Sequence, residues 1–200
     1  MGCPSSSQVL HLRRMASLSA PQAAWRDPLV RFFAFAGSLY LGWYLLYDLV
    51  IHPWGVLDRA LIDQLIRLSG AILRGLGETL IPEPANAEMI RTIGVEGGHL
   101  LWIGDPCNGL SIFTVFLIFL AAYPGPRLHK TWFALIGILS IHLINALRIV
   151  VLCLVVKVDY ELLNFNHDYT FYVIVYGWVF LLWYLWVKRF ANRGVGTGRP

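Results

Sequence analysis

Four stretches of apolar residues, each nearly free of charge, constrain the fold of this chain more than any other feature. They cover residues 32–51, 108–123, 131–156 and 169–187. A helix needs roughly 20 apolar residues to cross the hydrocarbon core of a bilayer, and helices satisfy all their backbone polar groups there. The 200-residue chain is only 14% charged, whereas soluble domains carry about 25% charged residues. We therefore predict an all-α, polytopic membrane protein with about four transmembrane helices.

The segment between the first two apolar stretches has a different pattern. Over residues 60–80, leucine and isoleucine recur at helical spacing, while charged residues, among them Asp63 and Arg67, occupy other positions, as Asp58 does just before. This pattern predicts an amphipathic helix that lies on the membrane or packs on the bundle. Insertion as a fifth span stays open, although four or five charges make it costly. Farther on, residues 90–95 and 99–103 flank Glu96-Gly97-Gly98 and predict a small extracytoplasmic hairpin.

The distribution of charge predicts the orientation in the membrane. With the N-terminus inside, ten of the sixteen Lys and Arg residues lie on the cytoplasmic side, together with only one of the twelve acids. This is the positive-inside arrangement. We expect a cytoplasmic tail (1–31), one membrane domain (32–187) with an extracytoplasmic segment (52–107), and a basic cytoplasmic tail (188–200). The protein is thus predicted to be a multi-pass plasma (inner) membrane protein with both termini in the cytoplasm.

This topology places three reactive residues at the outer face of the membrane. Cys107 directly precedes the second span, and His167 directly precedes the fourth. Arg148 lies 17 residues after Thr131 in a span that starts inside. At 1.5 Å per residue this is roughly 26 Å, close to the outer surface. The three side chains are therefore expected at one depth, although they come from different spans.

Each of the three residues has a chemical interpretation and a simpler one. Asp105-Pro106-Cys107 predicts an N-cap, a first helical residue and a thiol in the first turn, where free N–H groups favour a thiolate. Arg148 could hold an anion such as an oxyanion, and His167 could carry a proton. The alternatives are a buried apolar cysteine, an arginine that reaches the lipid headgroups, and an ordinary interfacial histidine.

Together, a thiol, an imidazole and a fixed cation suit acyl transfer. Asn145 lies on the same helical stripe as Arg148, and we assign it a supporting, hydrogen-bonding role. No cofactor is expected, and the three cysteines lack the spacing of a metal site or a disulfide framework. The other candidates receive no catalytic role: His52, His99, His129 and Cys153.

Three motifs resemble those of the exosortase/archaeosortase family of membrane proteins. They are Cys107-Asn108-Gly109-Leu110 at the start of one span, Asn145-Ala146-Leu147-Arg148-Ile149 near the outer end of the next, and His167 before the last. The similarity covers roughly residues 94–189. The chain differs from many members in having four spans instead of about eight, and in having Asn108 where serine is common. It therefore resembles a compact form of the family.

The resemblance implies a catalytic triad of Cys107, Arg148 and His167. It also implies a membrane-embedded cysteine protease or transpeptidase. Such an enzyme cleaves membrane-anchored proteins at a C-terminal signal made of a short motif, a transmembrane helix and a basic tail. The cleaved protein would then be transferred to an acyl acceptor that the sequence does not identify. Nucleic acid is not an expected partner.

A second, non-enzymatic hypothesis stays open. The chain could be a membrane assembly or scaffold protein that acts with surface polysaccharide or with sorted proteins. It would then use Arg148 and the aromatic fourth span, and Cys107 would be dispensable. A channel or transporter fits less well, because one intramembrane arginine without a pair of broken helices offers little of a substrate pathway.

Overall fold

The computed structural model describes residues 27–82, 91–161 and 171–190. Its long helices are α3 (Pro28–Leu46), α5 (Val56–Gly75), α6 (Leu110–Ala122), α7 (Arg127–Val158) and α9 (Phe171–Arg189). A π-helical turn, η1 (Tyr47–Ile51), and the short helix α4 (His52–Trp54) join α3 to α5. A 3-10 turn, η2 (Asp105–Cys107), precedes α6. The described part is mostly helical, as predicted.

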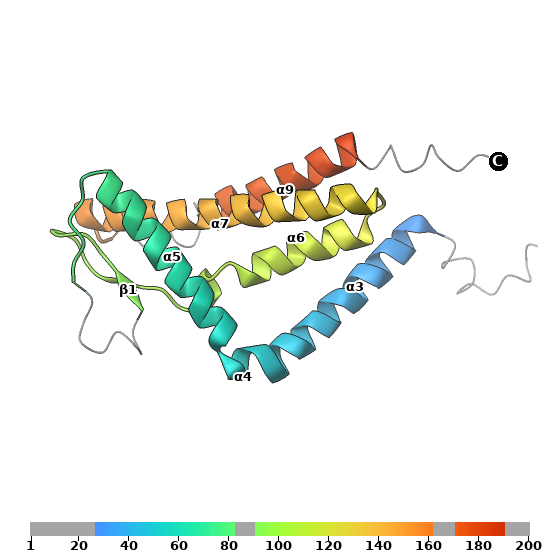
Figure 1. The fold of residues 1–200 in the computed structure, drawn as a ribbon, viewed down its shortest axis with the longest axis horizontal. Coiled ribbons are helices and arrows are strands. Elements are labelled where there is room, and N and C mark those ends of the chain that lie inside the picture. The colour runs from blue at the N-terminus through green and yellow to red at the C-terminus, as the bar shows by residue number, and fades with distance from the viewer. Residues whose placement is uncertain (1–26, 83–90, 162–170, 191–200) are drawn as a thin grey trace, which may run out of the picture.

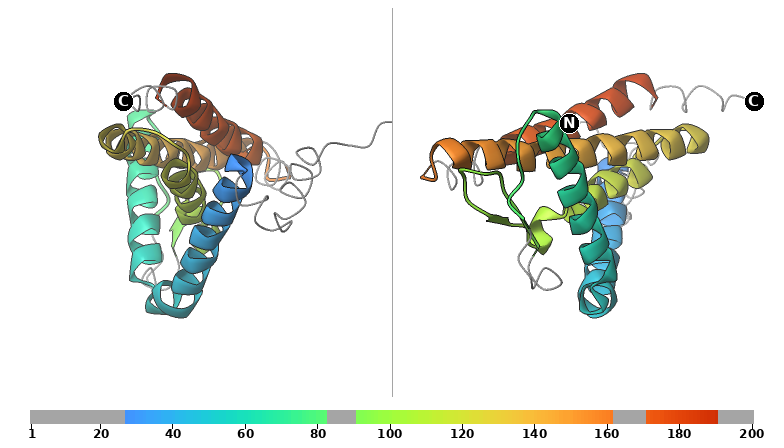
Figure 2. Two further views of the ribbon diagram at one scale, coloured as in Figure 1. Left: turned by 90° about the vertical axis from the view of Figure 1, so that its right-hand side faces the viewer. Right: turned by 60° about the vertical axis from the view of Figure 1, so that its left-hand side comes forward.

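The helices form a small bundle around α7. α7 and α9 lie side by side, and α6 packs against both (Figure 1). α5 crosses the C-terminal half of α7 at a steep angle, and α3 and α5 meet at α4 in a V (Figure 2). The N-terminal end of α3 contacts the C-terminal end of α6 through aromatic rings. The ring centroid of Phe32 lies 5.8 Å from that of Phe119 and 5.9 Å from that of Tyr123, the residue after α6.

Two helices of the described part are long and apolar enough to cross a membrane: Pro28–Trp54 and Arg127–Val158. They contain the predicted spans 32–51 and 131–156 and extend beyond them at both ends. The first begins earlier because the Asp27 carboxylate accepts a hydrogen bond from the Leu29 N–H and Pro28 suits a first helical position. It ends later because η1 and α4 carry the helical path past Ile51.

The second predicted span is shorter than the sequence pattern indicates. α6 has 13 residues and a length of about 20 Å, whereas the apolar run covers 108–123. Gly109 has a left-handed backbone (φ 83°) and Tyr123 an extended one, so neither continues the helix. The described part of α9, Phe171–Arg189, ends two residues after the predicted run 169–187. Membrane crossing by α6 and α9 therefore stays a prediction.

The amphipathic helix and the hairpin both form. α5 packs on the bundle, against α7, and the Ser69 hydroxyl donates a hydrogen bond to the Ala146 carbonyl at 3.2 Å. The strands β1 (Thr92–Ile93) and β2 (Leu101–Trp102) are antiparallel, with Thr92 opposite Trp102 and Ile93 opposite Leu101. The hairpin lies beside the C-terminal end of α7 (Figure 2).

Two hydrophobic cores follow one another along α7. The first, near its N-terminal half, is largely aromatic and joins α6, α7 and α9; it includes Phe116, Ile141 and Trp186. The second is aliphatic and joins α5, the hairpin and the last turns of α7, from Ala146 to Val156. Asn145 lies on α7 at the junction of the two cores, and this junction positions the candidate site.

The outer surface of α7 is apolar as well. Trp132, Ile136, Leu139 and Leu143 are exposed and follow one another at helical spacing, opposite the buried Ile141 and Asn145. An apolar stripe that faces away from the protein core is suited to lipid contact. This agrees with a helix that spans the bilayer beside its neighbours.

Candidate active site

Cys107 lies in a tight turn before α6, and not in the first turn of that helix as predicted. Asp105, Pro106 and Cys107 form η2, whose N-cap is Gly104. Gly109 then takes a left-handed conformation (φ 83°) and caps α6, which begins at Leu110. The sequence pattern predicted that α6 begins about one turn too early, because Gly109 was not recognised as a break. Glycine is suited to this reversal of the chain, since it adopts a left-handed conformation without steric cost.

Asn108 caps the start of α6 from the side. Its Oδ1 accepts a hydrogen bond from the Leu110 N–H at 2.8 Å. This satisfies one of the free N–H groups at the helix N-terminus. Each residue of the motif Cys107-Asn108-Gly109-Leu110 therefore has its own role in the turn. Cys107 carries the thiol, Asn108 caps the helix, Gly109 reverses the chain, and Leu110 begins α6.

Asn145 connects this turn to α7. Its Nδ2 donates a hydrogen bond to the Cys107 carbonyl at 2.8 Å, and its side chain is 1% exposed. Buried amides need such partners, because an unpaired polar group in the interior costs free energy. Asn145 thus holds the backbone of Cys107 and does not touch its sulfur through this bond. Such a contact orients the thiol.

Cys107 and Arg148 line the same cavity. The cavity has a volume of about 370 Å³, and its lining includes Asn145 and the ring-bearing residues Trp102 and Tyr160. Arg148 lies three residues after Asn145, less than one turn of α7 away, and its side chain is half-buried. The structure thus brings together a thiol and a guanidinium that are 41 positions apart in sequence.

His167, the third predicted member, lies outside the described residues. Of the other histidines, His99 is exposed and its ring lies tilted beside that of Tyr160, with ring centroids 4.8 Å apart. His129 lies at the opposite end of α7, beside Phe190. Cys153 is 1% exposed in the aliphatic core, where burial leaves it no access to substrate.

Sequence analysis missed a buried polar cluster behind the turn. Asp58 of α5 is only 2% exposed, and its Oδ1 accepts a hydrogen bond from Asn108 Nδ2 at 2.6 Å and one from the Tyr47 hydroxyl at 3.1 Å. His52 Nδ1 lies 3.6 Å from Asp58 Oδ2 and 3.8 Å from Asp105 Oδ2. His52, which was assigned no role, therefore neighbours the turn that carries Cys107.

A signal for Asp58 was present in the pattern of α5. The buried residues of that helix are Asp58, Ile62, Leu65, Ser69, Gly70 and Leu73. The apolar stripe formed by Ile62 and Leu65, extended by one turn toward the N-terminus, reaches Asp58. A carboxylate on the buried face of an amphipathic helix is a candidate for a specific contact.

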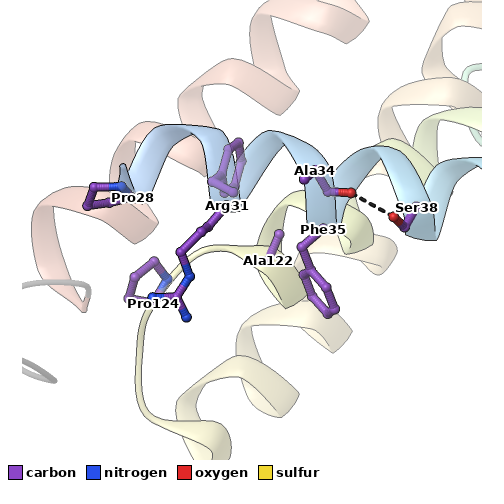
Figure 3. Close-up of a pocket in the computed structure, with 8 residues that line it drawn as sticks. Pro28, Arg31, Ala34, Phe35, Ser38, Ala122 and Pro124 are labelled. Atoms are coloured by element: carbon purple, nitrogen blue, oxygen red, sulfur yellow. Dashed lines mark hydrogen bonds between the residues drawn. The ribbon is translucent and has the colours of Figure 1, made fainter. Parts of the chain in front are cut away.

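A second cavity, of about 650 Å³, lies at the far end of α6, between the start of α3 and the Ala122–Pro124 segment (Figure 3). Arg31 extends toward Pro124 there, and the Ser38 hydroxyl donates to the Ala34 carbonyl at 2.8 Å. Its lining has neither a thiol nor an imidazole. The smaller cavity differs in having a thiol in its lining beside a guanidinium, those of Cys107 and Arg148.

The comparison with protein families agrees with these motifs. A family model described as transmembrane exosortase matches residues 31–187. The match includes α3 and α5 as well as the part from residue 94 onward, so it covers more than half of the chain. No curated protein and no solved structure matches the chain. The family predicted from the sequence motifs is confirmed, and the chain belongs to the transmembrane exosortases.

Proposed function

We propose that this protein is a membrane-embedded cysteine transpeptidase or protease that cleaves other membrane proteins at a C-terminal sorting signal. One observation carries the proposal: Cys107 and Arg148 line one cavity, in a chain that belongs to the transmembrane exosortases. A thiolate is a strong nucleophile, and a guanidinium is a permanent cation with several N–H donors. The pair supplies a nucleophile and a group that stabilises negative charge.

The reaction would proceed in two steps. The Cys107 thiolate attacks a peptide carbonyl, and Arg148 stabilises the negative charge on the oxygen of the tetrahedral intermediate. The C–N bond then breaks, a thioester forms on Cys107, and His167 donates a proton to the leaving amine. An amine or another nucleophile of an acceptor, or water, then attacks the thioester and gives its proton to His167; the C–S bond breaks and the thiolate is regenerated. The assignment of His167 rests on its place in the sequence motif.

The cavity lining supports this use of the site. Between Lys130 and Lys157 of α7, Arg148 is the one Lys, Arg, Asp or Glu residue, and a cation within a membrane span is costly unless it faces an anion or water. Trp102 is 68% exposed beside it, and Leu100 is 42% exposed, so an extended apolar segment has a surface to lie on. We propose that the substrate signal consists of a short motif held at this cavity, followed by a transmembrane helix and a basic tail.

The orientation is part of the proposal. Both termini would lie in the cytoplasm, and the cavity would lie at the extracytoplasmic face of the plasma (inner) membrane. The basic tail of the substrate would then stay on the side that the positive-inside rule favours. The hairpin and the α5 helix would cover the site from outside the bilayer.

The test is processing of a co-expressed membrane protein that ends in such a signal. Cys107→Ala and Cys107→Ser should each abolish cleavage, and Arg148→Gln should lower its rate by roughly 10²-fold or more, as loss of an oxyanion donor does. Cys153→Ala is the matched control, because it removes a buried thiol away from the cavity. Immunoblotting of the substrate measures the result.

Normal cleavage by a membrane-inserted Cys107→Ala variant would contradict the enzymatic proposal. That outcome would favour the non-enzymatic alternative, in which the protein assembles with sorted proteins or surface polysaccharide. Equal loss in Cys107→Ala and Cys153→Ala would also contradict it, because the two thiols have different surroundings.

A further inference from the structure

Asp58 is buried at the N-terminal end of α5. Its exposure is 2%, and it lies in the first turn of the helix, where the helix dipole favours a negative charge. A carboxylate at this depth needs several polar partners, because burial removes its water. The identity of those partners shows what the carboxylate holds.

The partners come from both sides of the carboxylate. On the side of the α3–α5 corner lie Tyr47 of η1 and His52 of α4. The Tyr47 hydroxyl donates a hydrogen bond to Asp58 Oδ1 at 3.1 Å, and His52 Nδ1 lies 3.6 Å from Asp58 Oδ2. Asn108 lies on the other side and donates at 2.6 Å. The Asn108 bond joins residues 50 positions apart and connects α5 to the residue that follows Cys107.

The turn at Cys107 is thus held at two points. α7 holds the Cys107 carbonyl through Asn145 at 2.8 Å, and α5 holds Asn108 through Asp58. The two helices pack against each other, with the buried Ser69 hydroxyl bonded to the Ala146 carbonyl. Because α7 also carries Arg148, these contacts determine where the thiol lies relative to the guanidinium.

We propose that Asp58 is a positioning residue for Cys107. By accepting the hydrogen bond of Asn108, Asp58 holds the turn in the position that places the thiol in the cavity lined by Arg148. This role rests on the proposed function, in which the thiol and the guanidinium act on one carbonyl. Tyr47 and His52 support Asp58 from behind, and Asp105 faces the same imidazole at 3.8 Å.

A purely structural role for Asp58 predicts a different result. If Asp58 only stabilised the corner between α3 and α5, its loss would lower the stability of the protein without changing the surroundings of the Cys107 sulfur. The experiment must therefore report the charge beside the Cys107 sulfur. Two alkylating reagents of similar size, the anionic iodoacetate and the neutral iodoacetamide, provide this readout.

The quantity to compare is the alkylation rate with iodoacetate divided by the rate with iodoacetamide. This ratio is independent of the fraction of thiolate and of access to the sulfur, since both affect the two reagents alike. A cation beside the sulfur raises the ratio, by roughly threefold for one charge about 6 Å away at a water-like dielectric. Rates at Cys107 are measured by peptide mass spectrometry on the full-length protein in detergent. This separates Cys107 from Cys3 and Cys153.

Arg148→Gln gives the ratio expected without the cation. Asp58→Ala removes the acceptor of Asn108 and should lower the ratio toward that value. Asp58→Asn loses the same charge but keeps an acceptor oxygen, so its ratio should not fall below that of the wild type. Asn108→Ala breaks the same contact and also removes the cap on the Leu110 N–H, so it should lower the ratio at least as far as Asp58→Ala does. Adding Asp58→Ala to it should cause no further loss, because the contact between the two residues is already broken. Asp105→Ala is the matched control: it removes a carboxylate nearer in sequence to the thiol, and it should not lower the ratio.

Three outcomes would overturn the positioning role. They are a wild-type ratio in Asn108→Ala or in a folded Asp58→Ala, an equal loss in Asp58→Ala and Asp58→Asn, and a loss in Asp105→Ala. Circular dichroism and gel filtration identify variants that fail to fold. If Asp58→Ala is one of them, Asn108→Ala takes its place, and a wild-type ratio there overturns the positioning role. If Arg148→Gln keeps the wild-type ratio, the thiol and guanidinium do not act together, which overturns the proposed pairing as well. If Arg148→Gln lowers the ratio and Asp58→Ala does not, only the positioning role fails.

Discussion

At the scale of residues, the candidate site depends on a four-residue turn, Cys107–Leu110, that is held by several specific contacts. Cys107 lines the cavity, and its carbonyl accepts a hydrogen bond from Asn145. Asn108 contacts both Asp58 and the Leu110 N–H. Gly109 has φ 83°, a left-handed conformation that costs other residues roughly 1–2 kcal/mol. The turn is therefore sensitive to changes that leave every reactive group in place.

Gly109→Ala tests this sensitivity. A Cβ at Gly109 would lie 3.2 Å from Asn145 Nδ2, the donor to the Cys107 carbonyl. We expect slower substrate processing and a melting temperature lower than that of the wild type. Gly77→Ala is the matched control: it has a similar backbone (φ 88°), and nothing lies within 4 Å of its added Cβ. It should lose stability through backbone strain alone and keep wild-type processing.

Processing rates in membranes and thermal unfolding in detergent measure the two effects separately. Equal processing by the two alanine variants would contradict the view that crowding at Asn145 disturbs Cys107. A loss of stability in Gly77→Ala without a loss of processing would support it, since strain and site geometry would then be distinct.

At the scale of elements, α7 determines the arrangement because each half packs against different partners. Its N-terminal half contacts α6 and α9 through aromatic rings, and its C-terminal half contacts α5 and the hairpin through aliphatic side chains. At 32 residues it is about 48 Å long, more than a bilayer core of about 30 Å requires. The extra length lets one helix belong both to the membrane bundle and to the part that covers the site.

The contact between α6 and α7 requires a glycine. A Cβ at Gly137 would lie 2.2 Å from the Phe116 ring, which is itself fully buried. Small residues allow helices to approach closely in membranes. Gly137→Ala should therefore destabilise the protein by about 1–3 kcal/mol, as overpacking does. Thermal unfolding in detergent measures the loss.

Gly177→Ala is the control for helix propensity in this pair. Gly177 lies in α9, where nothing is within 4 Å of the added Cβ, so this variant should be neutral or slightly stabilising. A Gly137→Ala protein as stable as Gly177→Ala would show that Phe116 moves aside without cost, against the prediction.

At the scale of the whole molecule, the charge distribution and the position of the cavity lead to one testable topology. The turn at Glu96 lies beside the C-terminal end of α7, where Gly98 is close to Lys157, and the loop at Pro124 joins α6 to the N-terminal end of α7. Both residues are exposed. If both helices cross the bilayer, these residues face opposite aqueous compartments. The proposed orientation puts Glu96 outside and Pro124 inside.

Cysteines introduced at these two positions, one at a time, test the orientation. In a chain with Cys3 and Cys107 replaced by alanine, Glu96→Cys should react with a membrane-impermeant maleimide in intact cells. Pro124→Cys should react only after the membrane is permeabilised, and the buried Cys153 should stay unlabelled in both. Labelling of Pro124→Cys in intact cells would reverse the proposed orientation and place the Cys107 cavity in the cytoplasm.

Much of the architecture follows from local patterns in the sequence. Apolar runs, the amphipathic stripe of α5 and the glycines of the hairpin predict helices and strands because each depends on residues a few positions apart. The motifs around Cys107 and Arg148 also identified the family, since their order and spacing are visible in the chain. The break at Gly109 was missed because an apolar run gives no sign of one left-handed residue.

The sequence by itself determined that this is a membrane protein of the exosortase family, because hydrophobic runs and short motifs need no knowledge of contacts. Only the tertiary structure decided which side chains meet. Asn145 reaches Cys107 across 38 positions, and Asn108 reaches Asp58 across 50. Such contacts depend on how α5 and α7 cross, which is set by side-chain packing between helices. The burial of Asp58 behind the turn of Cys107 was, for this reason, visible only in the structure.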